Sequence, residues 1–343
     1  MNTIQKVAKK VQQISTDYIP TKLRFRFSSG VEALSVRVLD SLNANGRSLS
    51  SNRWTGESRI RRIVTDRRFP KLLLRVIAKE FLPTRGTLRI SLDHSVFGGI
   101  TLAVLAVSAG EGRALPIWCT VTRTGRGHPL LKPLIRGLKQ LVDLLSYEQR
   151  GRAIVIMDRW FASPDLLVWL DDRNIKFLVR VKANCPLGVP WQNPGKTLPA
   201  GEISQGDVNV TYHDRNWRFV RSDYRPGMKG EEPWMLLTNI PQNKLTRQQI
   251  IRTYAKRFEI EEHFKDIKWI QRFKWHKIKH LAVAQNVFMF AFLGWWLLNK
   301  TLRTIAKRSR QRKQHLKKRL SWFRTVWEYW QRIRQKDFLF ATE

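Results

Sequence analysis

The stretch Leu88–Asp93 (LRISLD) alternates apolar and polar side chains, which predicts a strand with one buried face. Further elements are predicted over residues 100–108 (strand), 115–121 (strand), 130–145 (helix), 153–157 (strand), 164 onward (helix) and 176–181 (strand). The predicted order is therefore strand, strand, strand, helix, strand, helix, strand. That succession indicates an α/β fold with one central sheet.

This order is the ribonuclease-H-like layout, in which the first and fourth strands lie side by side. Asp93 ends the first predicted strand, and Asp158 directly follows the wholly apolar fourth strand, Ala153–Met157. We therefore expect the two carboxylates to converge at one edge of the sheet. Taken singly, each aspartate is more readily explained as a turn residue. Residues 183–240, rich in Gly, Pro and short strand-like runs, are expected to form an inserted β domain.

A third group of polar residues comes late in the chain, in a stretch that is predicted to be one long helix. Tyr254, Arg257, Glu261 and Lys268 fall within roughly 60° of one another around such a helix. The neighbouring acids at positions 259 and 262 point away from this stripe, so geometry selects Glu261 as its carboxylate. The alternative is a solvated helix face that carries a ladder of charged side chains.

Three carboxylates from two strands and a helix would make a site for hard divalent cations, because Mg²⁺ prefers oxygen ligands. Two such ions about 4 Å apart can activate an attacking oxygen and stabilise a leaving oxygen in a displacement at phosphorus. Asp93, Asp158 and Glu261 are therefore the candidate metal ligands. His94 would point to the opposite face of its strand from Asp93, and with His263 it is left out of this set.

The composition points to a polyanionic partner. The chain has 343 residues, of which 63 are Lys or Arg and 27 are Asp or Glu, for a net charge of +36. Such an excess exceeds what solubility requires and fits nucleic acid. Its two cysteines are too few for a disulfide framework, and the N-terminus lacks a secretory signal, which favours the cytoplasm. The apolar stretch 281–298 contains Gln285 and Asn286, so we expect a buried core helix rather than a membrane span.

Both ends of the chain are basic. Residues 1–80, with 17 basic and 6 acidic side chains, are expected to form a helical DNA-binding region with a helix-turn-helix character. Arg59, Arg61 and Arg62 would project from its second helix toward a DNA groove; an ordinary basic helical hairpin is the alternative. Residues 301–343 are expected to form a basic helical region that contacts DNA or a second subunit.

The motifs ISLDHS (residues 90–95), IVIMDRWF (residues 154–161) and the Tyr254/Arg257/Glu261/Lys268 spacing resemble the three catalytic blocks of DDE transposases of the insertion-sequence-four family. The Tyr-x2-Arg-x3-Glu-x6-Lys pattern is that family's signature. The resemblance covers residues 85–300 approximately, and it implies that they form a ribonuclease-H-like catalytic domain interrupted by the β insertion at 183–240. It departs from the family at Trp160, where many relatives carry a small residue beside the second aspartate.

The resemblance implies roles for individual residues. Asp93, Asp158 and Glu261 would bind two Mg²⁺ ions, for which Mn²⁺ would substitute. Tyr254, Arg257 and Lys268 would hold the DNA backbone next to the scissile bond. Trp234, in the β insertion, would stack on a flipped base; its alternative role is a core tryptophan of the insertion.

The function implied is cut-and-paste DNA transposition through 3′-strand nicking, a hairpin intermediate and strand transfer. The expected partners are double-stranded DNA (terminal inverted repeats and target) and a second copy of the chain in a synaptic complex. The expected location is a prokaryotic cytoplasm, at the nucleoid when the protein is bound to DNA, with no membrane. Two alternatives stay open: a catalytically inactive regulator that binds the DNA ends, and a structure-specific nuclease that cleaves without joining.

Overall fold

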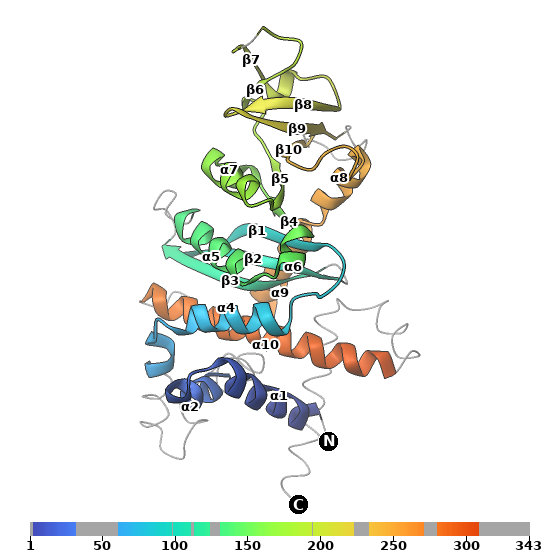
Figure 1. Ribbon diagram of the computed structural model, residues 1–343. Coiled ribbons are helices and arrows are strands. Elements are labelled where there is room, and N and C mark those ends of the chain that lie inside the picture. The colour runs from blue at the N-terminus through green and yellow to red at the C-terminus, as the bar shows by residue number, and fades with distance from the viewer. Residues whose placement is uncertain are drawn as a thin grey trace, which may run out of the picture.

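The computed structural model describes residues 3–31, 61–97, 99–110, 113–123, 131–193, 195–222, 233–270 and 280–308, which form a mixed α/β fold around one large sheet (Figure 1). The strands are β1 Leu88–Phe97, β2 Ile100–Gly110, β3 Arg113–Arg123, β4 Ala153–Met157, β5 Lys176–Arg180, β6 Pro186–Gly188, β7 Thr197–Pro199, β8 Asp207–Tyr212, β9 Arg215–Arg221 and β10 Met235–Thr238. The helices are α1 Thr3–Tyr18, α2 Thr21–Gly30, α4 Phe69–Glu80, α5 Leu131–Leu144, α6 Tyr147–Gly151, α7 Pro164–Asp172, α8 Arg247–Ala255, α9 Phe258–Ile270 and α10 Leu281–Arg308, with short 3₁₀ turns η3 Arg159–Phe161 and η4 Ala200–Glu202.

The sheet has ten strands in the order β3-β2-β1-β4-β5-β10-β9-β8-β6-β7. Strands β1, β4 and β5 are parallel to one another, and β2 and β3 pair antiparallel at one side. The predicted order of elements from β1 to β5 and the predicted neighbourhood of the first and fourth strands are both confirmed. The predicted β-rich segment is also present, but its strands extend the same sheet, because β10 pairs with β5.

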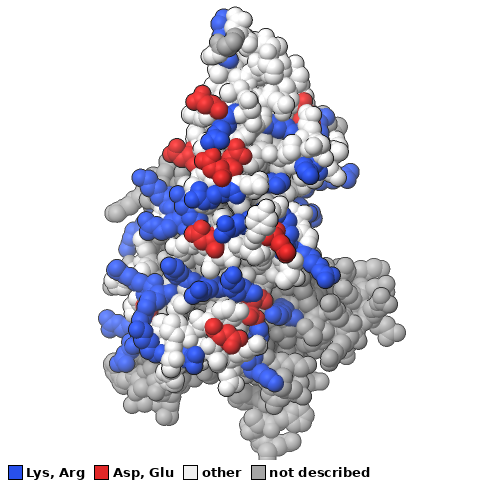
Figure 2. All heavy atoms as spheres, in the orientation of Figure 1, with Lys and Arg blue, Asp and Glu red and all other residues white. Residues whose placement is uncertain are grey.

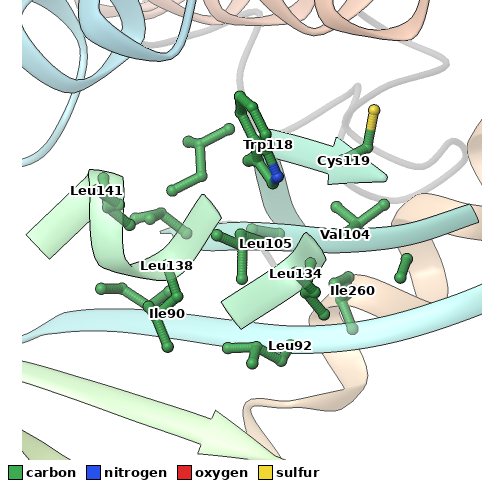
Figure 3. Packing of buried hydrophobic residues seen from close by; sticks show 14 of the residues in the cluster. Ile90, Leu92, Val104, Leu105, Trp118, Cys119, Leu134, Leu138, Leu141 and Ile260 are labelled. Atoms are coloured by element: carbon green, nitrogen blue, oxygen red, sulfur yellow. The ribbon is translucent and has the colours of Figure 1, made fainter. Parts of the chain in front are cut away.

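One face of the sheet is covered by α5. Ile90 and Leu92 of β1 point toward Leu134 and Leu138 of the helix, and all four side chains are fully buried (Figure 3). A side chain at Gly137 would collide with the indole of Trp118 on β3, so the glycine allows the helix to pack this closely. The alternation read in Leu88–Asp93 therefore directs its apolar residues into a packed core.

The opposite face is covered by α9 and α10, both of which contact β3. Helix α10 begins at the predicted residue and is buried along most of its apolar part, as predicted. The two amides that interrupt its apolar run are hydrogen-bonded in the interior. Gln285 donates to the Cys119 carbonyl (2.7 Å), and Asn286 donates to the carbonyls of Val64 (2.7 Å) and Asp66 (3.1 Å). Among the described helices none is long and apolar enough to cross a membrane.

The N-terminal helices pack beneath α10 and α4 (Figure 1). Tyr18 of α1 donates to Glu80 of α4 (2.9 Å), and Lys10 and Lys300 also pair with that carboxylate. Most of the predicted helix-turn-helix, including Arg59, lies outside the described residues, as do residues 309–343 of the predicted C-terminal region. Arg61 and Arg62 are described: they lie in a helical segment at residues 61–65 and are exposed.

Candidate active site

Asp93 lies inside β1 rather than at its end as predicted, because β1 continues to Phe97, and Asp158 directly follows the neighbouring parallel strand β4. Leu92 of β1 is in register with Met157 of β4, so the next residue along each strand is an aspartate. Because residues in register on parallel strands point to the same face, both carboxylates are expected on the face covered by α8 and α9. In the described part of the chain, Oδ1 of Asp158 is buried and accepts no hydrogen bond. The register therefore brings the two predicted acids together at one edge.

The predicted single helix from Tyr254 to Lys268 is wrong, because the segment is two helices. Helix α8 ends at Ala255 and α9 begins at Phe258, with Lys256 and Arg257 in a turn. The backbone there tightens: the amides of Arg257 and Ile260 donate to carbonyls three residues earlier, at 2.8 and 3.0 Å. From this turn the guanidinium of Arg257 reaches Asp93 of β1.

Arg257 joins two of the predicted acids. Its Nη1 donates to Oδ2 of Asp93 and its Nη2 donates to Oε1 of Glu261, each at 2.8 Å. Asp93 and Arg257 are 8% and 7% exposed, so this pair is shielded from water. The other oxygen of Asp93 accepts from the backbone amide of His94 at 2.7 Å. The carboxylates of β1 and α9 are thus held by one buried cation.

Two neighbouring acids of α9, Glu259 and Glu262, have partners of their own. Glu259 accepts from Ser108 of β2 at 2.5 Å and pairs with Lys256. Glu262 pairs with Lys265 at the surface. Glu261 is therefore the acid of this helix that faces Asp93 through Arg257.

Burial dominates the electrostatics of the pair. Desolvation raises the pKa of Asp93, and the attraction of Arg257 only partly opposes it. Burial alone would lower the pKa of Arg257, but the neighbouring Tyr254, Asp93 and Glu261 raise it above its ordinary value. The two shifts are not mirror images because the carboxylate loses more hydration than one guanidinium restores. The site favours an additional positive charge close to Asp93.

The carboxylate oxygens at this site are the kind of ligand that a hard divalent cation binds. Asp93 and Asp158 each follow the last paired residue of β1 and β4, and the buried Oδ1 of Asp158 is an acceptor without a donor. Within the described residues, however, no three His, Cys, Asp or Glu side chains gather closely enough to hold a metal ion. The reason is visible in the geometry: Arg257 lies between Asp93 and Glu261.

The remaining signature residues are partly described. Tyr254 is 1% exposed, and burial raises its pKa to about 12, so its phenol stays protonated at neutral pH. Trp234 is half-buried and packs edge-on against Tyr254, with ring centroids 5.1 Å apart. The backbone of Lys268 belongs to α9, and its side chain lies outside the description.

The sequence reasoning missed Phe258. This residue is 37% exposed, packs 5.8 Å from Trp234 and lies under the Arg257 guanidinium at 4.8 Å. Its only signal in the sequence is its place directly after Arg257. His263 is fully buried beside Trp295, and burial lowers its pKa to about 3, so it stays neutral.

Basic side chains gather over α4 and α5 on the face shown in Figure 2. Lys71, Arg75 and Lys79 of α4 recur every fourth residue and are exposed, as are Lys132 and Arg136 of α5. We call these five residues the basic stripes. Within the described chain none of the five is paired with an acid. By contrast, Arg26 and Arg68 of the N-terminal part pair with Asp66.

A family model described as a transposase DDE domain matches residues 103–297, more than half of the chain. The match contains Asp158 and Glu261 and begins after Asp93. No curated protein matches the chain. A similar solved structure is the piggyBac transposase in a synaptic complex with hairpin DNA, determined by cryo-EM. It is 13% identical, with a TM-score of 0.44, and the alignment covers 82% of this chain and 68% of that one.

Proposed function

The chain belongs to the transposase DDE domain family, and from this we propose that it excises and inserts an insertion sequence as a ribonuclease-H-like transposase with Asp93, Asp158 and Glu261 as its catalytic triad. Enzymes of this family carry out DNA transposition with divalent metal ions. The observation that carries the residue assignment is the geometry of the acids. Asp93 and Asp158 each follow the last paired residue of the parallel strands β1 and β4, and Glu261 reaches Asp93 through one guanidinium.

The three carboxylates would hold two Mg²⁺ ions, which supply Lewis-acid activation of the attacking and leaving oxygens. Asp158 would contribute the buried oxygen that now lacks a donor. Asp93 and Glu261 would exchange the Arg257 guanidinium for the metal. Arg257 would then be free to bind a phosphate oxygen beside them, the geometry for which a guanidinium is suited.

The other signature residues would position the DNA. The protonated phenol of Tyr254 can donate a hydrogen bond to a phosphate, and Lys268 would add positive charge. Trp234 rests on Tyr254, so a base stacked on its indole would lie close to that phosphate. The ring contacts of Trp234 support a role at the site, because its partners Tyr254 and Phe258 flank Arg257.

The reaction sequence would consist of in-line displacements at phosphorus. Water attacks and the P–O3′ bond breaks, which frees a 3′-OH. That hydroxyl attacks the opposite strand to close a hairpin, water reopens it, and the 3′-OH attacks target DNA. Each step forms one P–O bond and breaks one, so no covalent protein intermediate is needed.

Residues 1–80 would recognise the terminal inverted repeats, with Arg61 and Arg62 exposed for DNA and Arg59 beside them in sequence. Residues 85–300, with the β extension at 183–240, would perform the chemistry. Residues 301–343 would contact DNA or the second subunit of a homodimer in a synaptic complex. The basic stripes support DNA binding, because unpaired basic side chains repeated along a helix suit a phosphate backbone.

A second function is favoured by one observation. Because Arg257 separates Asp93 from Glu261 and no three-residue metal cluster is present among the described residues, the chain could bind DNA ends without cutting them. Such a protein would be a regulator of transposition.

Strand cleavage separates these functions. The purified protein is incubated with linear DNA that carries the element's own ends, with Mg²⁺ or EDTA, and products are resolved on a denaturing gel. We expect metal-dependent nicks at the repeat boundary from the wild type and from Glu262→Gln, and none from Glu261→Gln. End binding without cleavage by the wild type would support the regulator, and cleavage without joined products would support a nuclease.

A further inference from the structure

Trp160 is an exposed aromatic side chain at the edge that carries the acids. It follows Asp158 by two residues, in the short turn η3, and 54% of it is exposed. Its ring lies 5.3 Å from the imidazole of His94, tilted by 53°. The next residue, Phe161, is 4% exposed and also contacts His94, at 6.3 Å. A buried ring therefore anchors the turn, and His94 supports the exposed indole.

The place of His94 defines which side of the sheet the indole occupies. Ile90 and Leu92 point to the face covered by α5 (Figure 3), and His94 falls on that same face by strand alternation. Asp93 falls on the opposite face, where it binds Arg257 just before α9. Trp160, in contact with His94, therefore lies across β1 from Asp93. Trp160 and His94 nevertheless stay close to the acids along the chain. His94 directly follows Asp93 and its backbone amide donates to that carboxylate, and Trp160 follows Asp158 by two residues.

The side chains on the same face of the sheet as Trp160 indicate which kind of ligand this residue would bind. The face that holds His94 also carries α5, with the unpaired Lys132 and Arg136 of the basic stripes. Arg159, next to Trp160, is exposed as well. An exposed aromatic ring next to Arg159, on a face of the sheet that carries further basic side chains, suits a nucleotide, whose base stacks on the ring while its phosphates meet cations. A purely apolar partner would leave these charges without compensation.

We propose that Trp160, supported by His94, binds an unpaired nucleobase of a DNA strand that crosses the sheet edge beside Asp158. The base is held on the α5 side, so the strand continues over the edge to place a neighbouring phosphate at the carboxylates. This site is distinct from Trp234, which packs against Tyr254 of α8 and Phe258 of α9. The inference rests on the proposed function, since it assumes that the chain binds DNA.

The test uses the full-length chain and two DNA duplexes in EDTA, so that no strand is cut. One duplex carries a single unpaired 2-aminopurine, whose fluorescence falls when it stacks on an aromatic ring; the other is fully paired. The variants are Trp160→Ala, Trp160→Phe, His94→Ala and Trp191→Ala. Trp191 is the matched control, because it is also exposed (46%) but lies between β6 and β7, away from the acids.

We expect wild type and Trp191→Ala to quench the unpaired 2-aminopurine, Trp160→Phe to quench it in part, and Trp160→Ala not to quench it. Trp160→Ala should weaken binding of the unpaired-base duplex by about 5- to 150-fold, as for loss of one stacking platform, with little effect on the paired duplex. His94→Ala should reduce quenching without abolishing it.

Three results would overturn the inference. Unchanged quenching by Trp160→Ala would place the base elsewhere. Equal weakening of both duplexes would make Trp160 a structural residue. A change in oligomer mass on light scattering, with quenching intact, would assign the indole to a subunit contact. If wild type binds neither duplex, the proposed function itself fails and the inference falls with it.

Discussion

Replacing Arg257 by alanine should destabilise the fold, because the guanidinium neutralises a carboxylate that cannot reach water. The side chains of Asp93 and Arg257 are 11% and 9% exposed, and breaking such a buried pair costs about 3–5 kcal/mol. The second hydrogen bond of Arg257, to Glu261, adds little to the stability. Glu261 is 41% exposed, and a screened pair of that kind contributes about 1 kcal/mol or less. We therefore expect Arg257→Ala to lower the free energy of unfolding by about 3–5 kcal/mol at pH 7.

The loss should depend on pH in a defined direction. Burial already raises the pKa of Asp93 above its unfolded value, and removal of Arg257 raises it further. A raised folded-state pKa gives stability at low pH that is lost as the pH rises through that pKa. The gap between Arg257→Ala and wild type should therefore shrink as the pH is lowered from 7 toward 5. Mg²⁺ should stabilise the variant more than the wild type, since the cation would take the place of the guanidinium.

Urea denaturation followed by circular dichroism, at pH 7 and pH 5 and with Mg²⁺ or EDTA, measures these differences. Arg257→Lys is the matched control, since it keeps one charge but cannot bridge both acids. A free energy of unfolding for Arg257→Ala within 1 kcal/mol of wild type in EDTA at pH 7 would refute the reasoning. A loss that grows on acidification would also refute it.

Three further predictions concern other parts of the molecule. Glu261→Gln should abolish strand cleavage and leave end binding nearly intact in gel-shift assays, because it removes one negative ligand and little volume. The control Glu262→Gln should cleave normally. Cleavage by Glu261→Gln would exclude Glu261 from the triad. His263 stays neutral when folded, with a pKa of about 3, so its contribution is present above pH 6.5 and is lost as the pH falls. From pH 6.5 to 5 the wild type should lose about 2 kcal/mol more than His263→Gln in urea titrations, and equal losses would contradict the assignment. The double variant Lys132→Gln/Arg136→Gln should reduce the slope of log affinity against log salt by up to about 2 on random duplex DNA. The unaffected control is Lys196→Gln/Lys244→Gln, which removes the same charge from two exposed side chains, one in the β extension and one in the loop before α8. An unchanged slope would remove α5 from the DNA surface.

The strands around the acids, and the neighbourhood of the first and fourth strands, could be predicted from the sequence. Strand β4 was predicted at its observed bounds, Ala153–Met157, because a fully apolar run bounded by charged residues has few alternatives to a buried strand. The closeness of Asp93 and Asp158 followed from the parallel pairing of the two strands. These features are local or follow from chain order, which is why they could be predicted.

The features that could not be predicted depend on tertiary contacts. The turn at Lys256–Arg257 has no Gly or Pro to mark it, and it accompanies the ion pair between Arg257 and Asp93, 164 positions apart. Phe258 was overlooked because its partner Trp234 comes from another strand region. The support of Trp160 by His94 likewise joins residues that are distant in sequence. Periodicity carries no information about such pairs.

The central claim is that Asp93, Asp158 and Glu261 form a metal-dependent site for cutting and joining DNA. The most direct measurement is strand cleavage of the element's own end DNA by the wild type and by Asp93→Asn, Asp158→Asn and Glu261→Gln. The account predicts nicks at the repeat boundary that require Mg²⁺ and disappear in each variant, while every variant still binds the end. Cleavage that persists in EDTA or survives in any of the three variants would contradict it.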